Sequence, residues 1–154
     1  MKDYNSKFVL SLNGMERLLC ILNGYRKKSI SLEEEHEALV NVLDGLCSLL
    51  LVDECAEQFR RLQGFELLMS LSKKQGELRR HIIKLFDYAV TQHELPSSAK
   101  NARYFIEKGG LPIVFGVFMQ SGKKKKGDLV IKLTKEDHEQ DEQHVLNILV
   151  GLLI

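Results

Sequence analysis

The sequence predicts an all-α protein, a right-handed α-solenoid of about three consecutive repeats. Apolar residues recur at intervals of three and four along most of the 154-residue chain, which is the period of amphipathic helices. The chain has only two prolines, and it lacks the long polar–apolar alternation that indicates strands. One pattern, a short helix, a glycine and two further helices, occurs three times.

The first repeat is predicted to span residues 1–52. Its three helices are expected at about residues 5–12, 15–22 and 33–52. Gly14 separates the first two helices. Ser31 followed by Glu34 has the spacing of a capping box, which would fix the start of the third helix.

The second repeat is predicted to span residues 53–95 and follows the same order. Its three helices are expected at about residues 53–62, 65–71 and 77–91. Gly64 separates the first two helices, and Gly76 is expected to end the second helix before the third begins. The apolar residues of the third helix fall on one face, as expected for a helix packed against neighbours.

The third repeat is predicted to span residues 96–154 and carries an insertion. Its three helices are expected at about residues 97–108, 111–119 and 134–153. Ser97 or Ser98 is the expected cap of the first helix. A lysine-rich loop at about residues 121–133 separates the second helix from the third, and we expect it to leave the array as a poorly ordered or hairpin-like excursion.

The three glycines set the repeat length. Gly14, Gly64 and Gly110 lie 50 and 46 residues apart, and a helical period in the forties is typical of armadillo and HEAT repeats. We expect each glycine to end a helix in the left-handed conformation, and the repeats to form one continuous array. Residues 145–154 are apolar on more than one face, which indicates that the array continues beyond this chain or that the chain self-associates there.

Two stretches have distinctive sequences. One joins residues 105–112 to residues 115–121, a lysine cluster and residues 139–144, and the other joins residues 14–19 to residues 43–48. Both resemble the beta-catenin-like protein 1 family of armadillo-repeat proteins, over nearly the whole chain but only part of that family's longer protein. The resemblance implies a nuclear scaffold associated with the spliceosome, with partners in the nineteen complex that include a Myb-domain splicing factor. Because no basic N-terminal localisation tail is visible, the nuclear location comes from the resemblance alone.

Charge and motifs argue against several classes of function. The net charge is only +1, which does not favour a dedicated nucleic-acid binder with a dominant basic face. Cys20, Cys47 and Cys55 form no CxxC pair and are expected to be small buried hydrophobes. The five histidines fit no catalytic or zinc motif, and no apolar run is long enough to span a membrane. We therefore expect no enzyme activity, cofactor or metal site.

The third helices supply the candidate binding site. In armadillo arrays these helices line a concave groove that holds an extended peptide. Aligning the three copies places Asp44, Asp87 and Asn147 in register, with Ser48, Thr91 and Gly151 one turn later. A column of carboxylates would favour a basic partner segment, because carboxylates accept charge-assisted hydrogen bonds from Arg and Lys. The alternative is that these polar residues satisfy groups of the adjacent repeats.

The lysine-rich loop carries the alternative function. Its four consecutive basic residues are Lys123, Lys124, Lys125 and Lys126. With the residues of the 26–28 run they could contact RNA phosphates without sequence specificity, or the loop could serve as a nuclear localisation signal. A solvated loop is the other interpretation, since like charges between glycines resist ordering. We favour a scaffold that binds basic segments of partner proteins, with an RNA-contacting module as the alternative.

Overall fold

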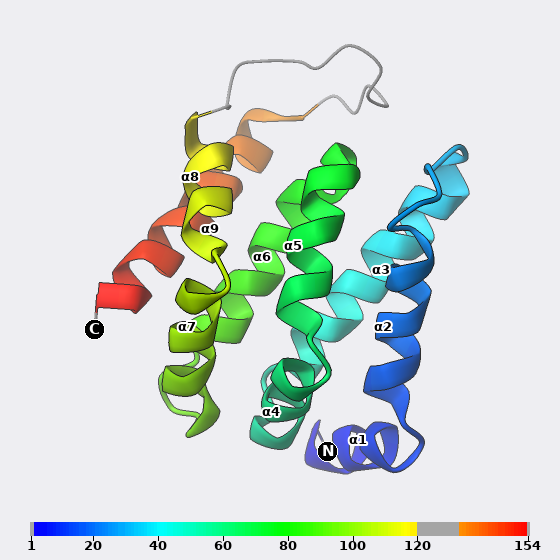
Figure 1. Cartoon of the computed structure of the whole chain (residues 1–154), viewed down its shortest axis with the longest axis vertical. Coiled ribbons are helices and arrows are strands. Elements are labelled where there is room, and N and C mark those ends of the chain that lie inside the picture. The colour runs from blue at the N-terminus through cyan, green and yellow to red at the C-terminus, as the bar shows by residue number, and fades with distance from the viewer. Residues whose placement is uncertain (1, 120–132, 154) are drawn as a thin grey trace.

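The computed structural model describes residues 2–119 and 133–153, and this part of the chain consists of helices and turns without a strand (Figure 1). The stretch Lys123–Lys126 and nearly all of the predicted loop lie outside the described residues. Within the described residues, no helix combines the length and apolar character needed to cross a membrane.

The helices form three successive triplets, and the predicted all-α solenoid is confirmed. The first helices of the triplets are α1 (Lys2–Ser11), α4 (Asp53–Arg61) and α7 (Ser97–Glu107). The second helices are α2 (Gly14–Gly24), α5 (Gly64–Lys74) and α8 (Gly110–Met119). The third helices are α3 (Glu33–Leu49), α6 (Arg79–Val90), which follows the 3-10 turn η1 (Gly76–Leu78), and α9 (Lys135–Leu153). In Figure 1 the second helices lie in front of the third helices, so the array has two main layers.

The corner between the first and second helix has the same backbone geometry in each triplet. Asn13, Gln63 and Gly109 have φ angles of 53°, 60° and 88° and are the described residues with positive φ. The expectation that Gly14, Gly64 and Gly110 themselves adopt this conformation is therefore wrong, because the residue before each of them does so. The left-handed residue ends one helix, and the glycine after it begins the next.

The glycine at each corner is required by close approach. A Cβ added to Gly64 would lie under 3.0 Å from the Phe59 ring, and one added to Gly110 would lie under 3.0 Å from the Phe105 ring. Each aromatic residue stands five positions before its glycine. The first helix therefore presses its side chain directly against the backbone that starts the second helix, and only glycine leaves room for it.

A cluster of phenylalanine rings fills the core between the second and third triplets. Phe59, Phe65, Phe86 and Phe105 are fully buried. Phe65 lies at the centre, with its ring centroid 5.0 Å from that of Phe59 and 6.0 Å from that of Phe105. Edge-to-face and tilted ring pairs of this kind add to the stabilisation from apolar burial. The cluster thus joins helices of two triplets into one continuous core.

The hydrogen-bond partners at the starts of α3 and α7 are not the residues predicted from local spacing. Glu35, not Glu34, accepts hydrogen bonds from the backbone N–H of Ser31 and of Leu32 at the start of α3. At the start of α7, the carboxylate of Asp53 in α4 accepts the Ser97 backbone N–H at 2.8 Å.

Neither predicted serine caps α7 with its own hydroxyl. The Ser98 hydroxyl instead donates to the carbonyl of Val90 at 3.1 Å. The start of α7 is therefore held by the preceding triplet, through α4 and α6.

The three cysteines differ in burial. Cys47 and Cys55 are buried as expected, whereas Cys20 is exposed, which corrects its assignment to the core. Burial raises the pKa of the Cys47 thiol to about 12. Helices α8 and α9 leave several large apolar side chains exposed at their end of the array, namely Phe115, Phe118, Met119, Leu146, Val150 and Leu153.

Candidate interaction surface of the third helices

The aligned polar residues of α6 and α9 meet in space. Asn147 Nδ2 donates to Asp87 Oδ2 at 3.1 Å. One turn further on, a Cβ added to Gly151 would lie 3.0 Å from Thr91 Cγ2, so these two positions are also adjacent. The structure therefore brings together the residues of α6 and α9 that the alignment placed in register.

Asp87 is not presented to solvent. It is 5% exposed, and its carboxylate accepts hydrogen bonds from Thr91 Oγ1 at 2.9 Å and from Asn147. The ring atom His144 Nδ1 lies 2.7 Å from Asp87 Oδ2, and it carries the proton because a carboxylate can only accept. This arrangement is the one expected if the polar column joins adjacent repeats. Asp87 and Asn147 serve here as a seam between α6 and α9.

Asp44 is the accessible carboxylate of the column. Its side chain is 47% exposed, and Lys84 Nζ of α6 lies 3.0 Å from its Oδ1. Ser48 is also exposed, but its hydroxyl donates to the Asp44 backbone carbonyl at 3.3 Å. Burial acts to lower the pKa of Lys84, but the hydrogen bond and the charge of Asp44 outweigh it and raise that pKa. Lys84 therefore stays charged and pairs with one carboxylate oxygen of Asp44, its Oδ1.

Arg80 of α6 forms ion pairs with two carboxylates of α9. Its Nη2 lies 2.9 Å from Asp137 Oδ1, and its Nε lies 3.2 Å from Asp141 Oδ2. Asp137 also accepts the backbone N–H of Thr134 and so holds the start of α9. This hydrogen bond, together with Arg80, lowers the pKa of Asp137 to about 2. Basic residues of α6 are thus flanked by carboxylates of α3 and α9.

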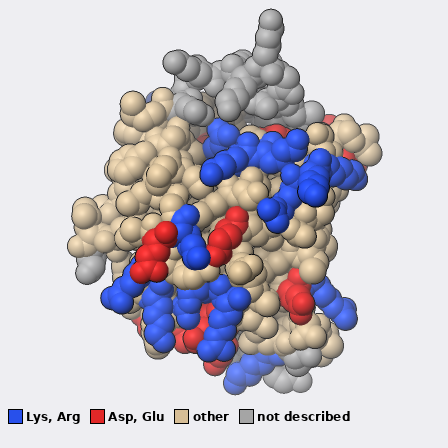
Figure 2. All heavy atoms as spheres, in the orientation of Figure 1, with Lys and Arg blue, Asp and Glu red and all other residues tan. Residues whose placement is uncertain are grey.

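Carboxylates outnumber basic residues on the third helices as a set. Helix α3 has five carboxylates and no Lys or Arg, α9 has five carboxylates and one Lys, and α6 has three basic residues and one carboxylate. These three helices therefore carry a formal charge of −7, and because the whole chain carries +1, its other residues together carry +8. Figure 2 shows basic side chains gathered on the face formed by the second helices. Net negative charge is therefore concentrated on the third helices, whereas the second helices α2, α5 and α8 together carry only +1.

Histidines of this surface make local contacts. The rings of His36 and His81 meet edge to face with centroids 6.2 Å apart. Burial, followed by the charge of Arg80, lowers the pKa of His81, so this ring is neutral at pH 7. Among the described residues, no group of three or more His, Cys, Asp and Glu side chains is arranged to hold a metal ion.

Comparison with known proteins identifies relatives along the whole chain. A family model described as "Catenin-beta-like, Arm-motif containing nuclear" matches residues 1–154. Beta-catenin-like protein 1 of Homo sapiens is 30% identical over 151 residues, which cover 98% of this chain and 25% of that protein. The same identity and shares are found for the Rattus norvegicus protein. A beta-catenin-like protein 1 homolog of Schizosaccharomyces pombe is 34% identical over 112 residues, 73% of this chain and 19% of that protein. The chain thus spans about a quarter of the length of the first of these relatives.

Proposed function

Because this chain belongs to the catenin-beta-like, Arm-motif containing nuclear family, we propose that it is a non-catalytic scaffold that binds basic segments of partner proteins on α3, α6 and α9. The Arm motif supports a helical-repeat protein-interaction role. The proposal that the bound segment is basic depends on one observation, the formal charge of −7 on the three third helices. A cationic segment is attracted to such a surface, whereas a phosphodiester backbone is repelled from it.

The proposed partners follow the family resemblance. We propose splicing-associated proteins of the nineteen complex, including a Myb-domain splicing factor, as the source of the basic segment, and the nucleus as the location. The family description contains the word nuclear, which supports the location. A pull-down from nuclear extract, with a third-helix variant as the control bait, would test these partners.

The bound segment would contact the exposed carboxylates of α3 first. Glu37 and Asp44 are seven residues apart, so they lie on the same face of α3. Glu37 is exposed, and Asp44 is only partly occupied by Lys84. Asp87 has no such role, because its hydrogen bonds lie within the α6–α9 seam.

The test removes these two charges without changing shape. The double substitution Glu37→Gln and Asp44→Asn should weaken binding of a fluorescein-labelled Lys/Arg-rich peptide by about 5- to 30-fold, since each partly exposed ion pair contributes up to about 1 kcal/mol. Fluorescence anisotropy at fixed ionic strength measures this change. The matched control is Glu54→Gln with Glu107→Gln, two exposed carboxylates of the first helices, which lowers the negative charge equally.

The control separates a local site from a general charge effect. We expect the control variant to bind the peptide as the unchanged chain does. An equal loss of affinity in both double variants would refute the proposed site. Thermal unfolding of both variants, followed by circular dichroism, checks that the array remains folded.

Self-association through the apolar end of the array stays a prediction. The exposed side chains Phe118 and Met119 of α8 and Leu153 of α9 support it, because contiguous apolar surface favours association. Sedimentation velocity over a range of concentrations would test it. A sedimentation coefficient independent of concentration and equal to that of a monomer would exclude it.

A further inference from the structure

A second charged surface lies at the far end of α2 and α5. Five exposed basic residues from two segments meet there, and we call them the basic corner: Arg26, Lys27, Lys28, Lys73 and Lys74. Gln75 joins the two segments. Its buried side-chain amide donates to the backbone carbonyls of Tyr25 at 2.9 Å and Lys28 at 2.6 Å. The last turn of α5 is therefore fixed beside the turn that follows α2.

Most charges of the basic corner are uncompensated. Lys28 pairs with Glu35 at 2.8 Å. The other four form no ion pair with any residue in the described ranges 2–119 and 133–153. Figure 2 shows Lys and Arg side chains gathered on the upper part of the face formed by the second helices. Gln75 keeps the two basic segments close together, so their positive charges repel one another. An anionic partner would relieve this repulsion.

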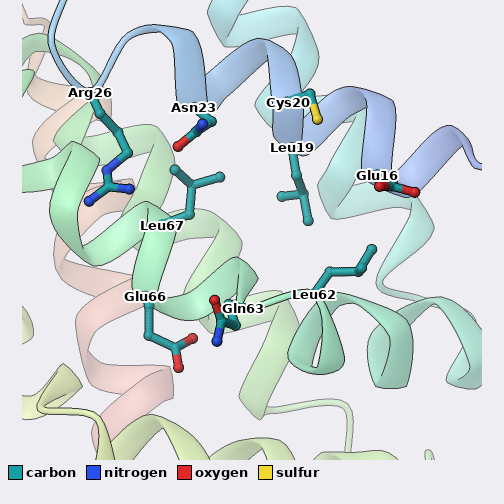
Figure 3. A pocket seen from close by; sticks show the side chains of 9 residues that line it. All are labelled: Glu16, Leu19, Cys20, Asn23, Arg26, Leu62, Gln63, Glu66 and Leu67. Atoms are coloured by element: carbon teal, nitrogen blue, oxygen red, sulfur yellow. The ribbon is translucent and has the colours of Figure 1, made fainter.

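A pocket with both apolar and polar lining residues opens directly beside the basic corner. It lies between α2 and α5, has a volume of about 420 Å³, and includes Arg26 in its lining (Figure 3). Leu19 of α2 and Leu62 at the end of α4 form one part of it, and Leu67 of α5 faces them. Leu62 is 37% exposed, so apolar surface is open to a ligand. This pocket has room for an aliphatic side chain of a partner.

We propose that the pocket and the basic corner together form a second interaction surface, which binds an acidic protein segment carrying a leucine-type side chain. The aliphatic side chain would enter the pocket, and carboxylates next to it would pair with Arg26, Lys73 and Lys74. The two contacts are adjacent because Arg26 belongs to both. The pocket lies between α2 and α5, and although Lys28 of the basic corner pairs with Glu35 of α3, the surface does not include Glu37 or Asp44, so it goes beyond the peptide site proposed above.

RNA fits this surface less well than an acidic protein segment. Glu16 lines the end of the pocket remote from Arg26, and Glu66 lines it below Leu67. These carboxylates repel a phosphate backbone, which carries a charge at every nucleotide along the groove. A peptide can keep its carboxylates at the basic corner and bring only its aliphatic side chain into the pocket. Single-stranded RNA also requires exposed aromatic rings on which bases stack. The aromatic residue next to the corner, Tyr25, is only partly exposed, and Lys28 Nζ lies 5.2 Å from its ring centroid.

The experiment uses the whole 154-residue chain and three probes. The first is a fluorescein-labelled, Glu-rich peptide of about a dozen residues with two leucines at a helical i, i+4 spacing. The second has serines in place of both leucines, and the third is oligouridylate of similar net charge. Anisotropy titrations at low and physiological salt give the affinities, and we expect the leucine peptide to bind most tightly.

Two variants locate the bound segment. Lys73→Glu with Lys74→Glu should weaken the leucine peptide by at least about tenfold, because two attractions become repulsions. The matched control, Lys100→Glu with Arg103→Glu, reverses two exposed charges on α7 and should leave binding within about twofold. Leu62→Ser should weaken binding of the leucine peptide but not of the serine peptide. The difference between these two effects is the coupling energy of a double-mutant cycle, and it shows whether the leucine side chains contact Leu62.

Several results would overturn the proposal. Oligouridylate bound more tightly than the leucine peptide would assign the corner to nucleic acid. Equal losses in the α5 and α7 double variants would show unspecific charge attraction. Absence of binding of the leucine peptide up to about 100 μM, a free energy near −5.5 kcal/mol, would exclude a useful site. Circular dichroism of each variant verifies its fold. We expect the basic peptide that tests the third helices to bind the Lys73→Glu, Lys74→Glu variant at least as well as the unchanged chain, so the two proposals can fail separately.

Discussion

At the scale of single residues, the tightest packing is found where each second helix begins. Gly64 faces the fully buried ring of Phe59, which packs edge to face against the buried ring of Phe65. We predict that Gly64→Ala lowers the free energy of unfolding by about 1–3 kcal/mol, as other cases of overpacking do. Urea denaturation followed by circular dichroism measures the change.

A glycine in open space provides the matched comparison. Gly45 is exposed within α3, and a Cβ added there meets nothing within 4 Å. Gly45→Ala should therefore stabilise the protein by about 0.5–1 kcal/mol, because alanine loses less backbone entropy in a helix. If both substitutions shifted stability in the same direction, close packing would not be the reason for Gly64.

The two aspartates of the polar column should respond differently to removal of charge. We predict that Asp87→Asn costs about 1–3 kcal/mol, since it leaves buried donors from Thr91, His144 and Asn147 poorly matched. Asp44→Asn should cost no more than about 0.5 kcal/mol, because its pair with Lys84 is partly exposed. Denaturation curves of the two single variants decide this. Similar costs would mean that Asp87 is not a seam residue.

Glu35 should make stability depend on acid pH. The hydrogen bond from Lys28, followed by the backbone N–H of Ser31, lowers its pKa to about 2 from an ordinary value of 4.5. A carboxyl with a lowered folded-state pKa stabilises the protein above its unfolded-state pKa and loses this contribution as the pH falls. We predict that the stability difference between the unchanged chain and Glu35→Gln is full at pH 7 and disappears between about pH 4.5 and pH 2. Urea denaturation across this range is the measurement, and a difference constant down to pH 2 would contradict it.

At the scale of helices, ends are fixed by other elements of the chain. Asp53 begins α4 and also accepts the Ser97 backbone N–H that begins α7. We predict that Asp53→Ala costs about 1 kcal/mol, like the loss of a helix cap, and that hydrogen exchange speeds up in the first turn of α7. Glu54→Ala, at the exposed neighbouring residue, is the control. Faster exchange confined to α4 would show that the cross-helix bond has no role.

These ends explain which part of the helical pattern could be predicted. The apolar period located each helix, because burial of one face determines the period. The capping partners could not be found from local spacing, since Asp53 lies 44 residues from Ser97. A three-residue capping rule also chose Glu34, although the hydroxyl and amide of Ser31 both reach Glu35.

For the candidate surface of the third helices, the sequence predicted which residues are neighbours but not which of them are buried. Alignment of the third helices put Asp87 beside Asn147, because repeats of one geometry keep their register. It did not predict burial of Asp87, which depends on how closely α9 packs on α6. The cross-helix partners Lys84 and Arg80 stand in other columns of the alignment, so a search along one column missed them. Basic residues four apart on α6, facing acidic helices on both sides, were the signal available.

At the scale of the whole molecule, the array is stabilised from one triplet to the next. Helix α6 packs against both α3 and α9, whereas α1 packs mainly on α2 at one end. In such arrays each unit depends on its neighbours, and terminal units open first. We predict the slowest amide hydrogen exchange in α5 and α6 and the fastest in α1, measured by mass spectrometry under native conditions. Uniform protection across the helices would indicate a single cooperative unit.

The segregation of charge has a consequence for the speed of encounter. Residues 120–132 carry +4 of the +8 outside the third helices, so the described residues outside these helices carry +4 against −7 on the helices themselves, and this uneven distribution gives the described array an electric dipole. Such a dipole turns the molecule relative to an approaching charged partner before the two touch, so a larger fraction of collisions is productive. Added salt would then slow association far more than it hastens dissociation, because screening acts mainly on partners that are still apart. A cationic segment would be steered toward the third helices and an anionic segment toward the basic corner, each guided by the same field.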